Sequence, residues 1–190
     1  MKIKKGHHRF VFIFPSLGIA IKLPFIRLWC LVKNVLHLSA RMKWRSLWIE
    51  MSSPVGYDFG LKSLLFHGIA NNWTEFMFFQ KTRNVFLQPT YFSFFGLLNI
   101  QKASDPCELN YVDLWCQLYE LTDGKVFVDR HHFENPDNFG FTNGKLRILD
   151  YGNKKTHGVI TEFGTKISES FDLTFDWEQK KKKLAGKRKS

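Results

Sequence analysis

Two polar residues, Asn138 and Asp150, lie twelve positions apart on either side of a segment with the pattern of a β-hairpin. Residues 131–138 read His-His-Phe-Glu-Asn-Pro-Asp-Asn, and residues 149–152 read Leu-Asp-Tyr-Gly. Between them lies Asn143-Gly144, a dipeptide typical of two-residue hairpin turns. An amide oxygen and a carboxylate are oxygen ligands of the kind that Mg²⁺ takes. The pattern therefore predicts a hairpin that brings these two polar side chains to neighbouring turns.

This stretch resembles the catalytic segment of the protein-kinase-like fold family. The family has Pro-Glu-Asn where this chain has Pro136-Asp137-Asn138, and Asp-Phe-Gly where it has Asp150-Tyr151-Gly152. The resemblance implies that Asn138 and Asp150 bind Mg²⁺ against the phosphates of ATP. Mg²⁺ and ATP are therefore the cofactors that we expect.

A second match lies near the N-terminus, where Ile19-Ala20-Ile21-Lys22 resembles the Val-Ala-Ile-Lys strand of protein kinases. Strand alternation places Ala20 and Lys22 on one face. The resemblance implies that Ala20 lies beside the adenine and that Lys22 contacts the α- and β-phosphates. An amphipathic edge strand with a partly buried lysine stem is the alternative, because the match covers only four residues.

The family's strand lysine pairs with a helical glutamate, and Glu75 is the residue that we expect in this role. It lies in a predicted helix that precedes a pair of predicted strands. Glu50, at the end of the preceding helix, is the rival, and a solvent-facing helical glutamate is the alternative. Residues 24–60 would then be a helical insertion, which departs from the family's pattern.

The family's catalytic base is an aspartate, and by alignment on Asn138 its place is taken by Phe133, which cannot accept a proton. Asp129 is the substitute base that we expect, through a loop that is a few residues longer. Glu134 and Asp137 are nearby carboxylates, and two histidines stand at 131 and 132. The histidines lack a second cluster with zinc-ligand spacing, so packing within the loop is the role that we predict for them.

The match covers residues 9–152 and departs from the family in two further ways. Gly18 stands alone before Lys22, where the family has a glycine-rich loop over the phosphates. Only 38 residues follow Gly152, too few for the family's helical peptide-binding platform. We therefore expect a truncated C-terminal lobe.

The elements that must position these residues give an α+β fold class. We expect a minimal protein-kinase-like fold with a small antiparallel N-lobe sheet, helices and a truncated C-lobe. The expected domain organisation is a basic leader at 1–8, an N-lobe at about 9–103, a C-lobe at about 107–178 and a basic disordered tail at 179–190. The expected strands are at 9–14, 19–23, 85–87, 91–100, with a bend or turn at Gly96, and 125–128. The expected helices lie within 25–51, 60–82 and 108–121. A linker is expected at 101–106 and a hairpin over 139–149.

Composition limits the cellular context. The 190 residues carry a net charge of +11, of which seven positive charges fall in residues 180–189, so the body is only modestly basic. Cys30, Cys107 and Cys116 are an odd set without CxxC spacing, which favours a reducing compartment. The apolar run at 10–21 is too short for a membrane span. We expect a cytoplasmic protein, and a viral or mobile-element origin fits as well.

Three functions follow from these features. The first is an ATP- and Mg²⁺-dependent phosphotransferase of an atypical, minimal type. The second is a catalytically inactive pseudokinase that acts as a binding or regulatory module. The third is a nucleic-acid-associated basic protein, because the lysines of residues 180–189 can neutralise phosphates without reading bases. The expected partners are a nucleotide and, through this tail, an acidic protein or a nucleic acid.

Overall fold

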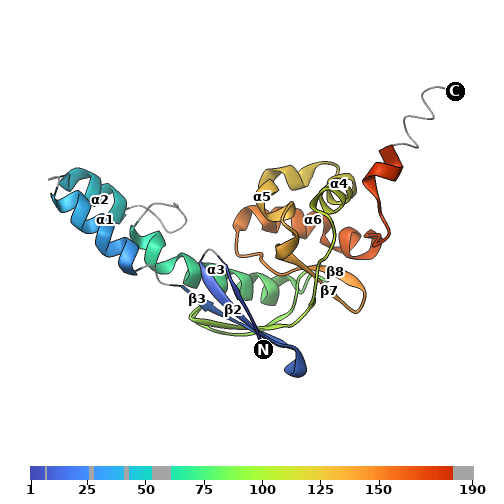
Figure 1. Ribbon diagram of the computed structural model, residues 1–190, viewed down its shortest axis with the longest axis horizontal. Helices are drawn as coiled ribbons and strands as arrows, with labels where there is room; N and C mark the ends of the chain where they lie inside the picture. The colour runs from blue at the N-terminus through green and yellow to red at the C-terminus, as the bar shows by residue number, and fades with distance from the viewer. Residues whose placement is uncertain (7, 26–27, 41–42, 53–60, 182–190) are drawn as a thin grey trace. The chain divides into compact units, whose positions relative to one another are not determined.

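A computed structural model describes residues 1–6, 8–25, 28–40, 43–52 and 61–181 (Figure 1). The fold is α+β, with several helices and two small antiparallel sheets, as the sequence predicted at this level. The chain divides into two compact units. The first unit comprises Met1–Met77 and Thr90–Ala103, and the second comprises Phe78–Pro89 and Ser104–Ser190.

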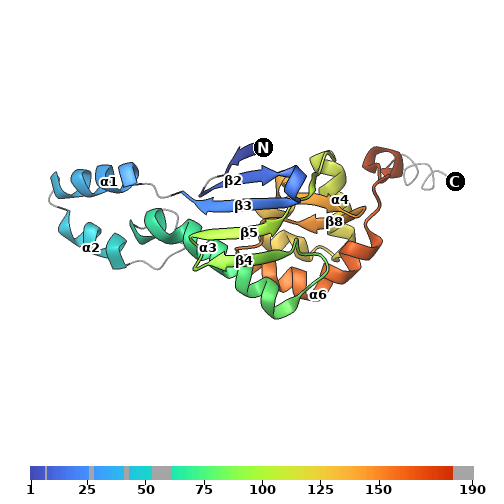
Figure 2. The same ribbon diagram turned by 90° about the horizontal axis from the view of Figure 1, so that it is seen from below.

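The first unit contains a five-stranded sheet in which every neighbouring pair is antiparallel (Figure 2). Its strand order is β1-β2-β3-β5-β4. The predicted hairpin of strands near 9–14 and 19–23 is confirmed, with Gly18 in the left-handed conformation (φ 63°) at its turn. The strands are β1 (Lys2–Lys5), β2 (Arg9–Phe14), β3 (Ile19–Pro24), β4 (Thr90–Phe94) and β5 (Leu98–Lys102).

Two sequence predictions for this sheet are wrong in detail. Residues 2–5 of the expected leader form β1, which pairs with β2 from Lys2↔Ile13 to Lys5↔Phe10 and so satisfies the backbone groups along that edge of β2. The predicted turn at Gly96 (φ 77°) within 91–100 is confirmed and joins β4 to β5, but β5 extends beyond the predicted end to Lys102.

The predicted helices of the first unit are confirmed as α1 (Leu28–Ala40), α2 (Trp44–Ser52) and α3 (Leu61–Thr82). Helix α3 lies along one face of the sheet (Figure 2). Gly96 lets the β4–β5 turn approach α3 closely, because a Cβ there would lie 2.2 Å from the Ile69 carbonyl oxygen. This close approach fixes the helix against the strands that carry the candidate site.

The second unit is built around a three-stranded sheet in the order β6-β7-β8. Its apolar core includes Phe86, Leu114, Phe133, Tyr151 and Ile160. The strands are β6 (Asp105–Pro106), β7 (Phe139–Thr142) and β8 (Lys145–Ile148). The helices are α4 (Tyr111–Leu121), α5 (Arg130–Phe133) and α6 (Lys154–Ser170), with 3₁₀ turns η2 (Lys125–Asp129) and η3 (Pro136–Asn138).

The predicted hairpin over 139–149 is confirmed. Asn143 (φ 54°) and Gly144 (φ 70°) both adopt left-handed conformations, as the two-residue turn requires. The predicted helix at 108–121 begins at Tyr111, because the Asn110 side chain accepts a hydrogen bond from the Val112 amide and caps it. This helix and the hairpin contribute Leu114, Phe139 and Ile148 to the core of the second unit.

Three other predictions for the second unit are wrong. Residues 125–128 form η2 rather than a strand, because the Lys125 and Phe127 amides bond locally to the Thr122 and Gly124 carbonyls. Residues 85–87 contribute one parallel bridge, Leu87↔Ile148, rather than a strand. The expected linker at 101–106 instead contains the end of β5 and the short strand β6.

The C-terminal part of the chain was not anticipated in the sequence analysis. Helix α6 begins after Asn153, whose side chain accepts from the Lys155 amide, and buries Val159, Ile160 and Ile167. The expected disordered tail from 179 is wrong at its start, because residues 177–181 are helical and Lys180 pairs with Glu120. The rest of the tail, residues 182–190, lies outside the described residues.

Two further properties concern the described residues alone. Cys107 and Cys116 are free thiols, and burial raises the pKa of both. No helix in the described ranges is both long enough and apolar enough to cross a lipid bilayer.

Candidate functional site

A buried ion pair joins Lys22 on β3 to Glu75 on α3. The lysine Nζ donates to Glu75 Oε2 at 2.8 Å, and the two side chains are 5% and 0% exposed. Strand alternation buries Ala20 together with Lys22, while Ile19 and Ile21 are only half-buried. The structure thus brings together three of the predicted residues. The side chain of the rival Glu50, in α2, is outside the described set.

Two side chains that were not predicted, those of Arg9 and Asn72, join this ion pair. Arg9 Nη1 lies 2.7 Å from Glu75 Oε1 as an ion pair and donates to Asn72 Oδ1 at 3.0 Å. Asn72 also donates to the Lys22 and Gly96 carbonyl oxygens, at 3.4 and 2.9 Å. The Glu75 carboxylate therefore holds cations from two adjacent strands, and Asn72 ties the same helix face to the sheet.

Asn99 adds an unusual acceptor beside the lysine. It stands opposite Lys22 in the β3–β5 register, so the two side chains lie on the same face. Its amide nitrogen donates to the Asn72 carbonyl oxygen at 2.6 Å. Its Oδ1 is buried without a hydrogen-bond partner among the described residues. A buried acceptor in this state is costly, and a ligand that donates to it would remove the cost.

In the second unit, the backbone of Asn138 is hydrogen-bonded to Leu149, the residue that precedes Asp150. Asn138 ends η3, and its backbone carbonyl accepts a hydrogen bond from the Leu149 amide at 2.7 Å, which places it next to Asp150. Its side-chain amide nitrogen donates to the His132 carbonyl oxygen at 3.0 Å, which leaves the amide oxygen to serve as a ligand. Asp150 is half-buried.

Tyr151 holds the backbone at Asp150 in place. Its ring is fully buried, and its hydroxyl donates to the Gln88 carbonyl oxygen at 2.7 Å. His157 Nε2 lies 2.7 Å from the Tyr151 carbonyl oxygen, and the His157 ring stacks on Phe78 at 3.6 Å. A tyrosine at this position is therefore explained by a buried hydrogen bond that a phenylalanine could not make.

Asp129, the expected substitute base, is held at both carboxylate oxygens. Oδ1 lies 2.9 Å from His132 Nδ1, and Oδ2 accepts a hydrogen bond from Thr156 Oγ1 at 2.6 Å. The residue ends η2 and is only 7% exposed. His132 comes from the adjacent α5 and Thr156 from the first turn of α6, so three elements meet at this carboxylate.

Burial raises the pKa of Asp129, but the hydrogen bonds from His132 and Thr156, aided by the charges of His132 and Lys155, outweigh it and hold the pKa below its usual value. The carboxylate is therefore ionised at neutral pH. An ionised carboxylate only accepts hydrogen bonds, so His132 Nδ1 carries a hydrogen. A carboxylate oriented by an imidazole and a hydroxyl can receive a proton from an acceptor alcohol.

The remaining residues of this loop have structural or surface positions. Phe133 is fully buried and packs against Phe139, with ring centroids 6.4 Å apart, so it serves the core. Glu134 pairs with Arg130 at 2.6 Å on the surface. Asp137 and His131 are exposed. Of the three loop carboxylates, Asp129, Glu134 and Asp137, Asp129 alone is buried among hydrogen-bond donors.

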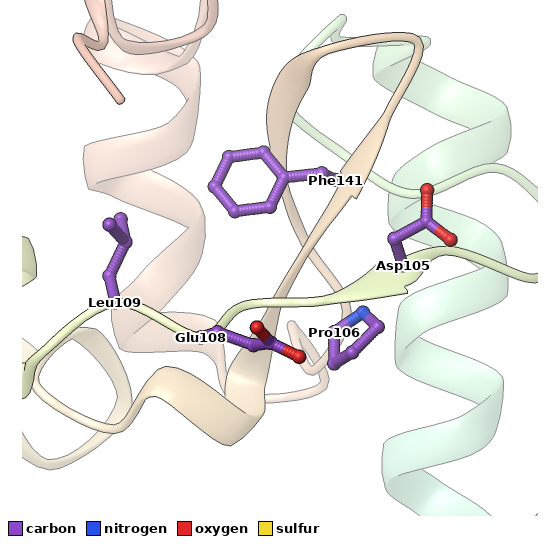
Figure 3. Close-up of a pocket in the computed structure, with 5 residues that line it drawn as sticks. All are labelled: Asp105, Pro106, Glu108, Leu109 and Phe141. Atoms are coloured by element: carbon purple, nitrogen blue, oxygen red, sulfur yellow. The ribbon is translucent and has the colours of Figure 1, made fainter. Parts of the chain in front are cut away.

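A separate surface pocket of about 400 Å³ lies in the second unit (Figure 3). Figure 3 shows the Phe141 ring and the Leu109 side chain lining it together with the carboxylates of Asp105 and Glu108. None of the predicted site residues lines this pocket. This pocket is therefore distinct from the polar clusters described above.

The residues missed by sequence reasoning differ in how well the sequence signals them. Asn72 precedes Glu75 by three positions, which places both on one helix face. A polar asparagine in the middle of a helix was the available signal. Thr156 gives no such signal, because it reaches Asp129 only through the packing of α6, 27 positions away.

The described residues contain no group of three or more His, Cys, Asp or Glu side chains arranged to hold a metal ion. Mg²⁺ bound with a nucleotide does not need such a group, since one or two carboxylates and the phosphates suffice. The Asn138 amide oxygen and the Asp150 carboxylate have the hard oxygen donors that this ion takes. The donor set therefore fits Mg²⁺ with a phosphate ligand better than a transition metal.

Comparison of the chain with protein-family models, with curated proteins and with solved structures found no significant match to any of them.

Proposed function

We propose that this chain is a kinase-like protein that binds a nucleotide with Mg²⁺ and acts as an atypical, minimal phosphotransferase. The observation that supports it most is the Lys22–Glu75 ion pair, at 2.8 Å and almost completely buried. The resemblance implied this pair for two residues that are 53 positions apart. A buried ion pair gives little net stability compared with apolar packing, so stability alone does not account for it.

In this proposal, each residue has one role. Lys22 contacts the nucleotide phosphates, Glu75 and Arg9 fix the lysine, and Ala20 leaves room for the base. Asn138 and Asp150 hold Mg²⁺, which neutralises charge on the phosphates when it is bound. Asp129 takes the proton from the acceptor hydroxyl as the γ-phosphoryl group transfers to that oxygen, the bond to the β–γ bridging oxygen breaks and ADP leaves.

A pseudokinase is the second candidate, and one observation favours it. Both oxygens of Asp129 are already engaged by His132 and Thr156, and the residue is almost entirely buried. A carboxylate held in this way is a poor base if the acceptor cannot replace one of these partners. The protein would then bind the nucleotide without transferring phosphate.

The test of binding is a thermal-unfolding scan with ATP or GTP, with and without Mg²⁺. A ligand at about 100 times its Kd stabilises by roughly 2.7 kcal/mol, which is about 5–10 °C for a chain of this size. Asp150→Ala should abolish the Mg²⁺-dependent part of this shift, and Asn138→Ala should reduce it. Asp105→Ala, an exposed carboxylate in the separate pocket, is the matched control and should shift like the wild type.

The outcomes separate the candidates. No shift with any nucleotide contradicts nucleotide binding, and equal shifts in wild type and Asp150→Ala contradict the metal assignment. A shift without transfer or hydrolysis of label from γ-labelled ATP indicates the pseudokinase. A shift with turnover that requires Asp150 supports the phosphotransferase.

A further inference from the structure

The helical pair α1–α2 leaves several large apolar side chains in solvent. Leu36 is 64% exposed, Trp44 is 63% exposed and Trp48 is 71% exposed. Val32 and Ile49 are also exposed. None of the described side chains in α1 and α2 is buried. The two helices lie side by side (Figures 1 and 2).

The exposed apolar residues form stripes that border cationic residues. Val32 and Leu36 are four positions apart on α1, and Trp44 and Trp48 are four positions apart on α2, so each pair lies on one helix face. Exposed cationic side chains stand next to them in sequence, namely Lys33, Lys43 and Arg45. Residues 27–50 contain five Lys or Arg residues and a single acidic one, Glu50.

This combination fits the surface of an anionic membrane. Interfacial helices place tryptophan and leucine at the boundary between headgroups and acyl chains, while lysine and arginine bind the anionic headgroups. Helices α1 and α2 have 13 and 9 residues, which is about 20 and 14 Å of helix and less than the hydrocarbon thickness. They can therefore lie on a bilayer but not cross it.

Two other occupants fit the same residues less well. A second copy of this hairpin would bring like charges together, because residues 27–50 carry a net positive charge. A nucleic acid would use the cations and stack on the tryptophans, but it has no use for the exposed Val32, Leu36 and Ile49. Of these three occupants, the lipid surface uses both the apolar and the cationic side chains.

We propose that the α1–α2 hairpin docks this protein on membrane surfaces that carry anionic lipid, with Trp44 and Trp48 inserted at the level of the headgroups. This role is independent of nucleotide binding, because Lys22, Asn138 and Asp150 take no part in it.

The test is flotation of the full chain with vesicles of phosphatidylcholine alone or with about one third phosphatidylglycerol. The wild type should float only with the anionic vesicles. Lys43→Gln with Arg45→Gln should weaken partitioning about 25-fold, from roughly fivefold for each cation removed. Trp44→Ser with Trp48→Ser should weaken it about tenfold or more and should remove most of the tryptophan quenching by brominated lipid.

Two controls separate the hairpin from other parts of the chain. Trp73→Ser removes an exposed tryptophan of the same unit that lines an apolar pocket with Phe66, Ile69, Ala70 and Phe95, and it should leave flotation unchanged. Lysines 180–183 all changed to glutamine should lower binding at low salt but leave quenching by brominated lipid intact. Circular dichroism and thermal unfolding of each variant show whether it is folded.

Four results would overturn the proposal. The first two are that the wild type does not float with anionic vesicles and that quenching is unchanged in the folded Trp44→Ser, Trp48→Ser variant. The third is that Trp73→Ser loses flotation as much as that variant does. The fourth is that binding depends on lysines 180–183 alone. A mobility shift of single-stranded RNA that requires Trp44 and Trp48, without flotation, would assign the hairpin to nucleic acid instead.

Discussion

The two polar clusters of this chain hold a carboxylate in different ways. In the first unit, Glu75 is completely buried and contacts two cations, Arg9 and Lys22, that come from neighbouring strands. In the second unit, Asp129 accepts hydrogen bonds from an imidazole and a hydroxyl, those of His132 and Thr156. Full charges therefore balance the first carboxylate, whereas dipoles and one titratable group balance the second.

This difference has consequences for stability and for pH. Removing one member of a buried ion pair leaves an uncompensated charge in a low-dielectric interior, which is among the most destabilising single changes. Removing a hydroxyl or an imidazole from a carboxylate costs one hydrogen bond and leaves the other in place. We therefore expect substitutions in the Glu75 cluster to lower the free energy of unfolding more than substitutions around Asp129.

The largest effect is expected for Glu75→Ala. This change leaves Arg9 and Lys22 buried without the carboxylate that they share, and it should lower the free energy of unfolding by about 3–5 kcal/mol. Denaturation in urea measures it. Glu134→Ala is the matched control, since it breaks a surface pair with Arg130 and should cost no more than about 0.5 kcal/mol. Similar losses in both variants would show that Glu75 is not specially held.

The second prediction concerns Asp129→Asn and rests on the proposed phosphotransferase. An amide cannot take the acceptor's proton, so label transfer from γ-labelled ATP should fall by about 10²–10⁴-fold while the thermal shift with ATP and Mg²⁺ persists. Asp137→Asn, on the exposed surface of the same loop, is the control and should transfer label normally. Transfer that is unaffected by Asp129→Asn would remove Asp129 as the base.

An intermediate effect is expected for Arg9→Met. The variant keeps an apolar side chain of similar length but removes one of the two cations beside Glu75, while the lysine remains at 2.8 Å. We expect a loss of about 2 kcal/mol, smaller than for Glu75→Ala because the carboxylate keeps one counter-charge. A loss as large as that of Glu75→Ala would mean that Arg9, rather than Lys22, is the main counter-ion.

A smaller effect is expected for Thr156→Val, which keeps the side-chain shape but removes the donor to Asp129 Oδ2. One hydrogen bond to a charged group is lost, so stability at neutral pH should fall by about 1.5 kcal/mol. The pKa of Asp129 should rise at the same time, because one cause of its lowering is gone. Thr161→Val on the exposed face of α6 is the control, and it should cost less.

The smallest effect is a pH dependence of stability due to Asp129. Because its pKa is lower in the folded protein than in the unfolded chain, its contribution is present above the unfolded pKa and is lost as the pH falls through the folded pKa. The difference in unfolding free energy between wild type and Asp129→Asn should therefore shrink between about pH 5 and pH 3. A difference that stays constant over this range would contradict the lowered pKa.

Local patterns determined much of this molecule. Aromatic and β-branched residues indicated β2, and period-two alternation in β3 buried Ala20 with Lys22 on one face. The Asn143-Gly144 turn fixed the β7–β8 hairpin, and with it the meeting of Asn138 and the residues next to Asp150. These features depend only on residues that are close in sequence, so the sequence alone is enough to predict them.

Where competing local conformations were close in energy, the secondary structure predicted from the sequence was wrong. The β-branched residues at 125–128 favoured a strand, but the turn after α4 supplied local hydrogen bonds to these residues. Residues 2–5 had no propensity that indicated a strand, and they became one because β2 offered an unpaired edge.

Only the tertiary structure decided two of the groups that surround these carboxylates. Arg9 reaches Glu75 across 66 positions, and Thr156 reaches Asp129 across 27. Nothing in the residues near Glu75 or Asp129 encodes these partners, because such contacts arise from how a helix packs on a sheet or on a turn. The sequence alone determined the residue types that can do chemistry, and packing determined which of them are buried, paired and held ready to act.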